Sequence, residues 1–170
     1  MKRLSLIRHA KSEWANEQLE DIDRPLNARG YADAKTMALR MKAAGNRPDA
    51  LFSSAAIRAS STALIFARVF ELESSQMIFT PKLYEAGEKK FLKELCHLPD
   101  QFSNIFVFAH NPTISSVASQ LSGEAGLNMP TCGIVNLVAD ISSWKELRTA
   151  ELMSFDFPKN EGDNKLIKDG

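Results

Sequence analysis

Short apolar runs alternate with longer segments of helical periodicity along most of the chain. The apolar runs predict buried strands at residues 2–8, 49–54, 76–81 and 104–110. The periodic segments predict helices at residues 31–44, 55–70, 88–98 and 112–123. Two further runs predict an antiparallel pair of strands joined around Ser142–Lys145, at residues 133–141 and 150–157.

Local signals strengthen three of these assignments. In residues 31–44 the apolar side chains recur at helical spacing, and Gly45 is placed to end the helix. The run NIFVFAH, residues 104–110, is nearly all apolar, as in a strand buried on both faces. Pro112 then lies near the start of the next predicted helix, where proline is well tolerated.

The alternation of strands and helices predicts the fold class. We expect an α/β fold, a three-layer α/β/α sandwich with a mostly parallel central sheet. The length of 170 residues fits one domain, since domains commonly have about 100 to 200 residues. We expect residues 1–157 to form this single domain and residues 158–170 to form a polar C-terminal tail.

Composition and charge exclude several classes of function. Lysine plus arginine equals aspartate plus glutamate, at 21 each, so we expect no nucleic acid as partner. No run approaches the roughly 18 apolar residues of a membrane span, and the N-terminal segment lacks a signal peptide. We therefore expect a cytoplasmic protein without a membrane partner. Cys96 and Cys132 lack metal-site spacing and are expected to be free thiols.

The candidate chemistry lies where the predicted strands end. In α/β sheets, ligands bind beyond the carboxyl ends of the strands. His9 ends the first apolar run and His110 ends the run NIFVFAH, so both are candidates for one pocket. Arg8, Arg58 and Glu85 occupy comparable positions after predicted strands. The polar stretch between the first strand and the first helix is a long loop, and long loops are often functional.

This combination of side chains suits phosphate. Arginine presents a rigid fork of donors that matches phosphate oxygens and keeps its charge. A neutral imidazole is a good nucleophile towards phosphorus, and a protonated carboxyl group could donate to the leaving atom. The sequence contains no GxxxxGKS loop, HExxH motif or clustered aspartates, so nucleotide- and metal-dependent alternatives lack their ligands. We expect neither a metal nor a cofactor.

Several ordered motifs over about residues 1–120 resemble one family. The stretch LIRHAKSEW looks like the signature of the histidine phosphatase superfamily, whose usual form is Arg-His-Gly. Its variant, with Ala10 followed by Lys11 and Ser12, is similar to the short SixA-like phosphohistidine phosphatases. Further matches to family segments follow in the expected order: DRPLNARGYADA, FSSAAIRASSTA, LYEAG and FAHNP. The resemblance implies a phosphoglycerate mutase-like fold.

The resemblance also implies roles for individual residues. His9 would be the catalytic nucleophile that becomes transiently phosphorylated, and Arg8, Arg58 and His110 would bind the phosphoryl oxygens, His110 also counting as catalytic. Glu85 matches the position of the family's catalytic proton donor, in a segment that varies more than the others. Lys11 replaces the acidic or amide residue often seen in sugar-phosphate members, which argues against a sugar-phosphate substrate.

These residues also have ordinary interpretations. Taken singly, the arginines could be surface cations, and a lone histidine is more often structural than catalytic. Glu85 could be a solvated carboxylate beside a helix, and His97, near a helix end, is interpreted as structural. Ser53 and Ser54 more often cap or pack, although they could shape the pocket. Trp14 could line the pocket rim or anchor its loop.

Three functions follow, in order of preference. The favoured one is a metal-independent phosphohydrolase with a phosphohistidine intermediate at His9, most similar to a SixA-like protein phosphohistidine phosphatase. The second is a small-molecule phosphomonoesterase on the same scaffold. The third is a non-catalytic domain that binds phosphate or a phosphoprotein. The expected partner is a phosphorylated protein or a small phosphorylated substrate, and a monomer is favoured.

Overall fold

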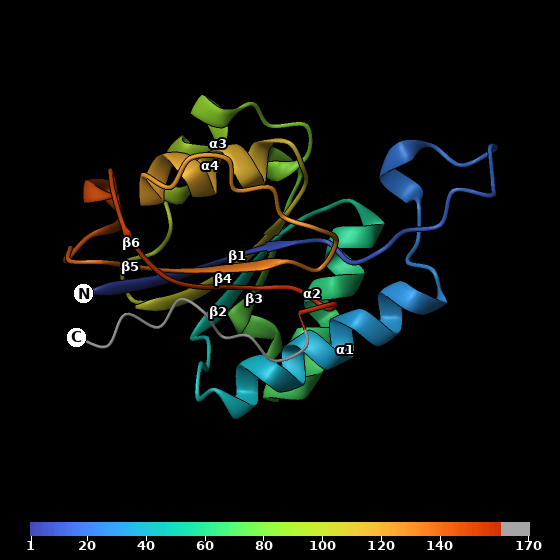
Figure 1. The fold of residues 1–170 in the computed structure, drawn as a ribbon, viewed down its shortest axis with the longest axis horizontal. Helices are drawn as coiled ribbons and strands as arrows, with labels where there is room; N and C mark the ends of the chain where they lie inside the picture. Colours follow the sequence, from blue (N-terminus) through green and yellow to red (C-terminus); the bar gives the residue numbers. More distant parts are fainter. Residues whose placement is uncertain (161–170) are drawn as a thin grey trace.

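A mixed β-sheet lies at the centre of the computed structural model, which describes residues 1–160 (Figure 1). Its strand order is β3-β2-β4-β1-β5-β6. The pairs β1–β4, β4–β2 and β2–β3 are parallel, whereas β5 pairs antiparallel with β1 and with β6. The strands are β1 Lys2–Arg8, β2 Ala50–Ser54, β3 Met77–Thr80, β4 Asn104–Ala109, β5 Ile134–Ala139 and β6 Glu151–Asp156.

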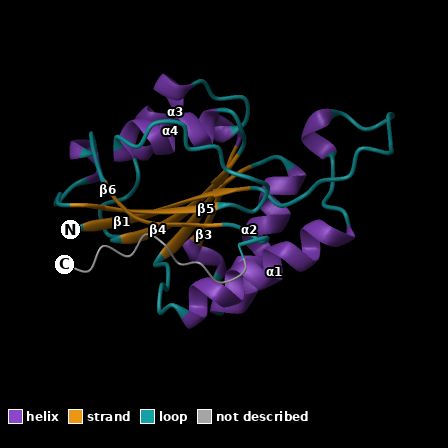
Figure 2. Cartoon of the chain, viewed as in Figure 1, coloured by secondary structure: helices purple, strands orange, loops and turns teal. Residues whose placement is uncertain are grey.

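Helices cover both faces of this sheet (Figure 2). One face carries α1 and α2, and the other carries α3 and α4 (Figure 1). The helices are α1 Ala28–Ala43, α2 Ile57–Phe70, α3 Glu88–Leu95 and α4 Thr113–Ser122. Short 3₁₀ turns are η1 Asp21–Asp23, η2 Ser74–Gln76, η3 Pro81–Leu83 and η4 Trp144–Glu146. The predicted three-layer α/β fold with a mostly parallel sheet is confirmed.

Strand β4 supplies apolar side chains to both layers, as its nearly continuous apolar sequence predicts. Phe106 and Phe108 pack edge-on against Phe66 of α2, at ring centroid distances of 6.4 and 5.2 Å. Ile105 and Val107 belong to the core on the α3 and α4 side. This burial fixes the central strands, and with them the residues at their carboxyl ends.

Several predicted boundaries were wrong by a few residues, because hydrogen bonds rather than apolar spacing decide them. The first helix begins at Ala28, before the predicted residue 31, since the Asn27 side chain caps it by accepting from the Gly30 amide at 2.9 Å. The second helix begins at Ile57, after the predicted residue 55, while the Ala55 amide donates to the Thr80 carbonyl at 3.1 Å. The third ends at Leu95, before the predicted residue 98.

The C-terminal part of the described chain lies against α1. Arg40 donates to the backbone carbonyls of Phe157, Pro158 and Asn160 at 3.2, 3.2 and 3.3 Å. The predicted polar tail begins at residue 158, and residues 161–170 of it lie outside the described residues. The division into residues 1–157 and 158–170 stays a prediction. No helix among residues 1–160 combines the length and the apolar character that a membrane crossing requires.

Candidate active site

The adjacent strands β1 and β4 bring two histidines together at one edge of the sheet. His9 follows β1 and His110 follows β4, and their ring centroids are 5.2 Å apart. The backbone beside His9 is held on two sides, because its amide donates to the Ala109 carbonyl at 3.1 Å and its carbonyl accepts from the Cys132 amide at 3.0 Å. Parallel pairing of β1 with β4 therefore places both rings in one pocket.

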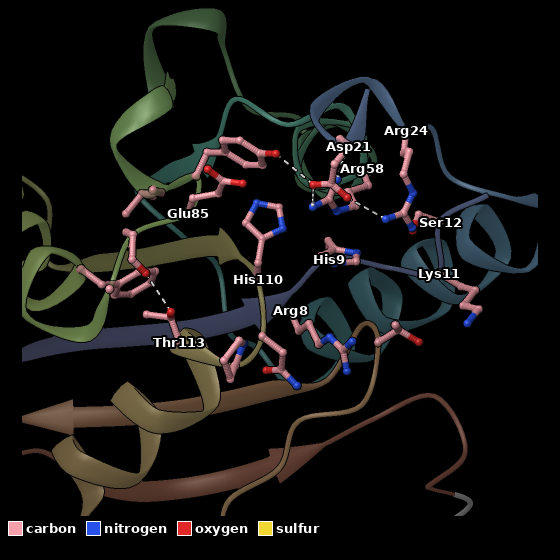
Figure 3. Close-up of a pocket in the computed structure, with 18 of the residues that line it drawn as sticks. Arg8, His9, Lys11, Ser12, Asp21, Arg24, Arg58, Glu85, His110 and Thr113 are labelled. Atoms are coloured by element: carbon pink, nitrogen blue, oxygen red, sulfur yellow. Dashed lines mark hydrogen bonds and ion pairs between the residues drawn. The ribbon is translucent and has the colours of Figure 1, made fainter. Parts of the chain in front are cut away.

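This pocket has a volume of about 620 Å³ and contains every site residue predicted from the sequence (Figure 3). These residues are Arg8, His9, Arg58, Glu85 and His110. They come from four separate segments: the end of β1, the start of α2, the turn before α3 and the end of β4. The roles that the family resemblance implies for them stay predictions.

His9 is held with one ring nitrogen available. His9 is buried, with only 8% of its surface exposed, and its Nδ1 lies 2.8 Å from the Ala10 carbonyl oxygen. A carbonyl only accepts, so Nδ1 carries the proton and Nε2 keeps its lone pair. Burial lowers the pKa of His9 to about 3; the Ala10 carbonyl opposes this shift, and the charges of His110, Arg58 and Arg8 add to it. The ring is therefore neutral at pH 7.

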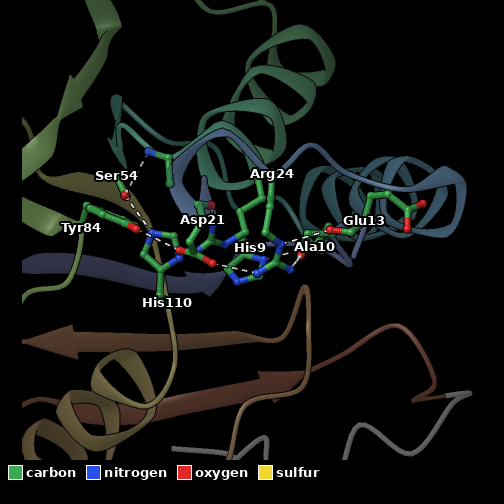
Figure 4. A network of polar contacts seen from close by, with 11 residues as sticks. His9, Ala10, Glu13, Asp21, Arg24, Ser54, Tyr84 and His110 are labelled. Atoms are coloured by element: carbon green, nitrogen blue, oxygen red, sulfur yellow. Dashed lines mark hydrogen bonds and ion pairs between the residues drawn. The ribbon is translucent and has the colours of Figure 1, made fainter. Parts of the chain in front are cut away.

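His110 is also neutral and is oriented by a serine. Its Nε2 lies 2.8 Å from Ser54 Oγ (Figure 4), whereas its buried Nδ1 has no hydrogen-bond partner among residues 1–160. Burial lowers the pKa of His110 to about 4, and the Arg58 charge adds to this effect while the charge of Asp21 opposes it. If Ser54 donates to Nε2, then Nδ1 carries a proton that can be offered to an oxyanion.

The two arginines are fixed in different ways. Arg8 donates from Nη1 to the Met129 carbonyl at 2.9 Å, and its buried Nε has no partner within residues 1–160. Burial also lowers the pKa of Arg8. Arg58 is 6% exposed and donates from Nη2 to Asp21 Oδ2 at 2.8 Å and from Nη1 to the Asp21 backbone carbonyl. Each guanidinium is thus anchored through part of its fork.

Asp21 is a pocket residue that the sequence reasoning missed. Besides Arg58, its Oδ2 accepts from Tyr84 Oη at 2.9 Å, and its Oδ1 accepts from Arg24 Nη1 at 2.8 Å (Figure 4). Partial burial raises the pKa of Asp21, but these three hydrogen bonds outweigh it and lower the pKa to about 2. Burial and the bond to Asp21 raise the pKa of Tyr84 to about 12. The polar, acidic loop after β1 was the available signal, but it does not reveal which acid turns inward.

Glu85 lies in the pocket on a turn of unusual backbone geometry. Its φ is +50°, in the left-handed region that non-glycine residues seldom adopt. Such conformations cost free energy and are found most often at functional sites. The following turn is held by Thr113, whose hydroxyl donates to the Ala86 carbonyl at 2.7 Å. The structure therefore brings Glu85 to the pocket that contains both histidines.

The rim of the pocket carries a stacked pair. Trp14 lines the pocket with 68% of its surface exposed, and the Arg24 guanidinium carbon lies 3.3 Å from the centroid of its ring. Both alternatives for Trp14 thus describe it in part, because it lies at the rim and is fixed to its own loop. The chain enters α3 at Glu88 and α4 at Thr113, soon after Glu85 and His110.

The remaining candidates lie elsewhere. His97 Nδ1 is 2.6 Å from the Lys93 carbonyl oxygen, in keeping with its structural interpretation. Cys96 and Cys132 are free thiols, and burial raises the pKa of Cys132 far above its usual range. Residues 1–160 contain no group of three or more histidine, cysteine, aspartate or glutamate side chains that could hold a metal ion.

Known proteins are similar to this chain in sequence or in fold. An uncharacterized chloroplastic protein of Arabidopsis thaliana is 33% identical over 153 residues, which cover 85% of this chain and 70% of that protein. A solved structure from Agrobacterium tumefaciens, assigned as phosphohistidine phosphatase SixA, is 28% identical with a TM-score of 0.78, over 91% of this chain and 97% of that one. The protein histidine phosphatase SixA complexed with tungstate shares the fold, with a TM-score of 0.79 at 19% identity over 92% of this chain and 97% of that one.

The family itself is identified by a sequence match. The family model described as histidine phosphatase superfamily (branch 1) matches residues 4–89, which include Arg8, His9, Arg58 and Glu85. His110 lies beyond this match and joins the same pocket through β4. The chain therefore belongs to branch 1 of the histidine phosphatase superfamily and is a phosphatase.

Proposed function

We propose that the chain is a metal-independent phosphohydrolase that works through a phosphohistidine at His9, and that its substrate is a phosphohistidine side chain of another protein. The observation that carries the proposal is the neutral His9 ring, whose Nδ1 is bonded to Ala10 and whose Nε2 is free among Arg8, Arg58 and His110. The likeness to the structure assigned as SixA supports the choice of substrate.

In this mechanism Nε2 of His9 attacks phosphorus in line with the leaving group. The Ala10 carbonyl then stabilises the positive charge that develops on the ring, because it accepts from Nδ1. Arg8, Arg58 and the Nδ1 of His110 bind the phosphoryl oxygens, where preorganised donors supply most of the stabilisation of the transition state. Glu85 donates a proton to an ester leaving group and then activates the water that hydrolyses the intermediate.

The shape of the site supports a protein substrate. The connections after Glu85 and His110 enter α3 and α4 at once, so they contribute no covering segment. A small metabolite gains affinity from burial, whereas a phosphorylated side chain gains it from the surface of the protein that presents it. We also propose the cytoplasmic location and the monomeric state expected from the sequence. The reaction at His9 does not depend on either of them.

Trapping the intermediate tests this proposal. Mixing the enzyme with a phosphohistidine protein and quenching in alkali should leave an acid-labile phosphoryl group on His9, detected by mass spectrometry of the peptides. His9→Ala should abolish both the label and turnover, while the matched control His97→Ala, which changes a histidine outside the pocket, should keep both. A label on His110 would reverse the roles of the two histidines, and turnover without any histidine label would refute the proposal.

A further inference from the structure

A carboxylate faces the phosphoryl pocket from the loop after β1. Asp21 lines the same pocket as His9, and its charge partly opposes the lowering of the His110 pKa that burial causes. In Figure 3, Asp21 and Glu85 lie on opposite sides of the His110 ring. A negative charge at this place opposes the binding of an anionic phosphoryl group. Its presence calls for a reason beyond phosphate binding.

The hydrogen bonds of Asp21 leave it one acceptor position. Its Oδ2 accepts two hydrogen bonds, from Arg58 Nη2 and Tyr84 Oη. Its Oδ1 accepts one, from Arg24 Nη1, although a carboxylate oxygen can accept two. The side chain is 49% exposed and remains ionised at neutral pH, because its pKa is lowered to about 2. Asp21 can therefore take a donor from a substrate but cannot act as the proton donor.

Resting on the phosphohistidine phosphatase activity proposed above, we infer that Asp21 is a specificity-determining residue. Its Oδ1 accepts a hydrogen bond from the protonated distal nitrogen of the phosphorylated imidazole. A phosphorylated imidazole keeps a basic ring nitrogen, which can be protonated near neutral pH. An ester leaving group has no such nitrogen. Asp21 thus favours P–N substrates over esters and over free phosphate.

The transfer balances without a proton from Glu85. His9 Nε2 forms a bond to phosphorus, the substrate P–N bond breaks, and its electron pair returns to the leaving nitrogen. The leaving ring departs as a neutral imidazole that keeps the proton on its distal nitrogen, beside Asp21. The positive charge passes to the His9 ring, whose Nδ1 donates to the Ala10 carbonyl. Each of the two exchanging rings therefore has its distal N–H bonded to an acceptor oxygen.

Asp21→Asn tests this inference with two probes, N-phosphoimidazole and 4-nitrophenyl phosphate. The variant should lower kcat/KM for phosphoimidazole by at least about tenfold, the effect of losing one charge-assisted hydrogen bond. Because Asp21 also anchors Arg58, some loss of kcat/KM is expected for the aryl phosphate, but it should be several-fold smaller than the loss for phosphoimidazole. The matched control Asp23→Asn removes the same charge from an exposed neighbour in η1 and should leave kcat/KM unchanged for both probes.

Equal losses with both probes would mean that Asp21 only positions Arg58, and would overturn the inference. A measurement on the unchanged chain covers the case in which Asp21→Asn does not fold. Its KM for phosphoimidazole should fall as the pH is lowered from 8.5 to about 6.5 and the distal nitrogen becomes protonated, and a KM independent of pH would overturn the inference. If the unchanged chain cleaves only the aryl phosphate, the proposed function itself fails.

Discussion

At the scale of single residues, the burial of the two pocket histidines makes the folded chain less stable at acidic pH. The pKa of His9 is about 3 in the folded chain, below the ordinary value of 6.5, and that of His110 is about 4. Between these values and 6.5 the unfolded chain binds more protons than the folded chain. The stability that belongs to the neutral rings is therefore present above pH 6.5 and is lost as the pH falls towards 3 to 4.

His9→Gln should reduce this dependence on pH. For His9 alone the loss is roughly 2 kcal/mol of unfolding free energy at pH 5. Urea unfolding at pH 7.5 and pH 5.0 should show a decrease that is smaller in the variant than in the wild type by about this amount. The control His97→Gln should keep the wild-type decrease. An equal decrease in wild type and His9→Gln would show that burial does not hold His9 in its neutral form.

At the scale of elements, the start of α1 supports the turn that follows His9. A Cβ at Gly30 would collide with the Lys11 carbonyl oxygen, which accepts from the Asn27 amide at 3.0 Å. On the other side of this turn, the Ala10 amide donates to Thr62 Oγ1 of α2 at 3.0 Å. The two helices thus hold the backbone next to His9.

Gly30→Ala should therefore destabilise the chain and lower its activity. Helix propensity alone would make this change stabilising by about 1 kcal/mol, but overpacking against fixed backbone costs about 1–3 kcal/mol. Urea unfolding measures whether the free energy of unfolding rises or falls. The control Gly87→Ala adds a Cβ in open space and should cost at most about 1 kcal/mol, through the cap of α3. A higher free energy of unfolding in Gly30→Ala would mean that the turn at Lys11 can move to accommodate the added Cβ.

The same elements explain what the sequence could and could not predict. Apolar runs such as NIFVFAH define their strands because burial requires them, and strand ends place His9 and His110 without further information. Asp21 could not be found in this way. Its position depends on hydrogen bonds to Arg58 and Tyr84, which are distant in sequence and leave no local pattern. The boundaries at Asn27 and Ala55 likewise depend on single hydrogen bonds.

At the scale of the whole molecule, the pocket that joins His9, Glu85 and His110 leads to a prediction about the leaving group. Glu85→Gln should lower kcat/KM for an alkyl phosphate by about 10²- to 10⁴-fold, because an alkoxide needs a proton to leave. For a phosphohistidine protein the loss should be much smaller, since imidazole leaves readily once protonated. The wild type should also prefer the phosphohistidine protein by kcat/KM. The control Glu88→Gln removes an exposed carboxylate of α3 and should affect neither substrate.

The opposite preference would change the assignment. Efficient hydrolysis of a sugar phosphate, together with no activity on any phosphohistidine protein tried, would favour a metabolite phosphatase on the same scaffold. Equal losses on both substrates in Glu85→Gln would show instead that the P–N bond needs the same proton donor as an ester.

The place of β1 within the sheet also has a consequence for biosynthesis. This strand, which ends next to His9, is made well before its partners β4 and β5, which comprise residues 104–109 and 134–139. While the ribosome adds the intervening residues, β1 has no neighbour to pair with. Such long-range pairing slows folding. The pocket beside His9 and His110 is therefore completed only after both partner strands have been synthesised.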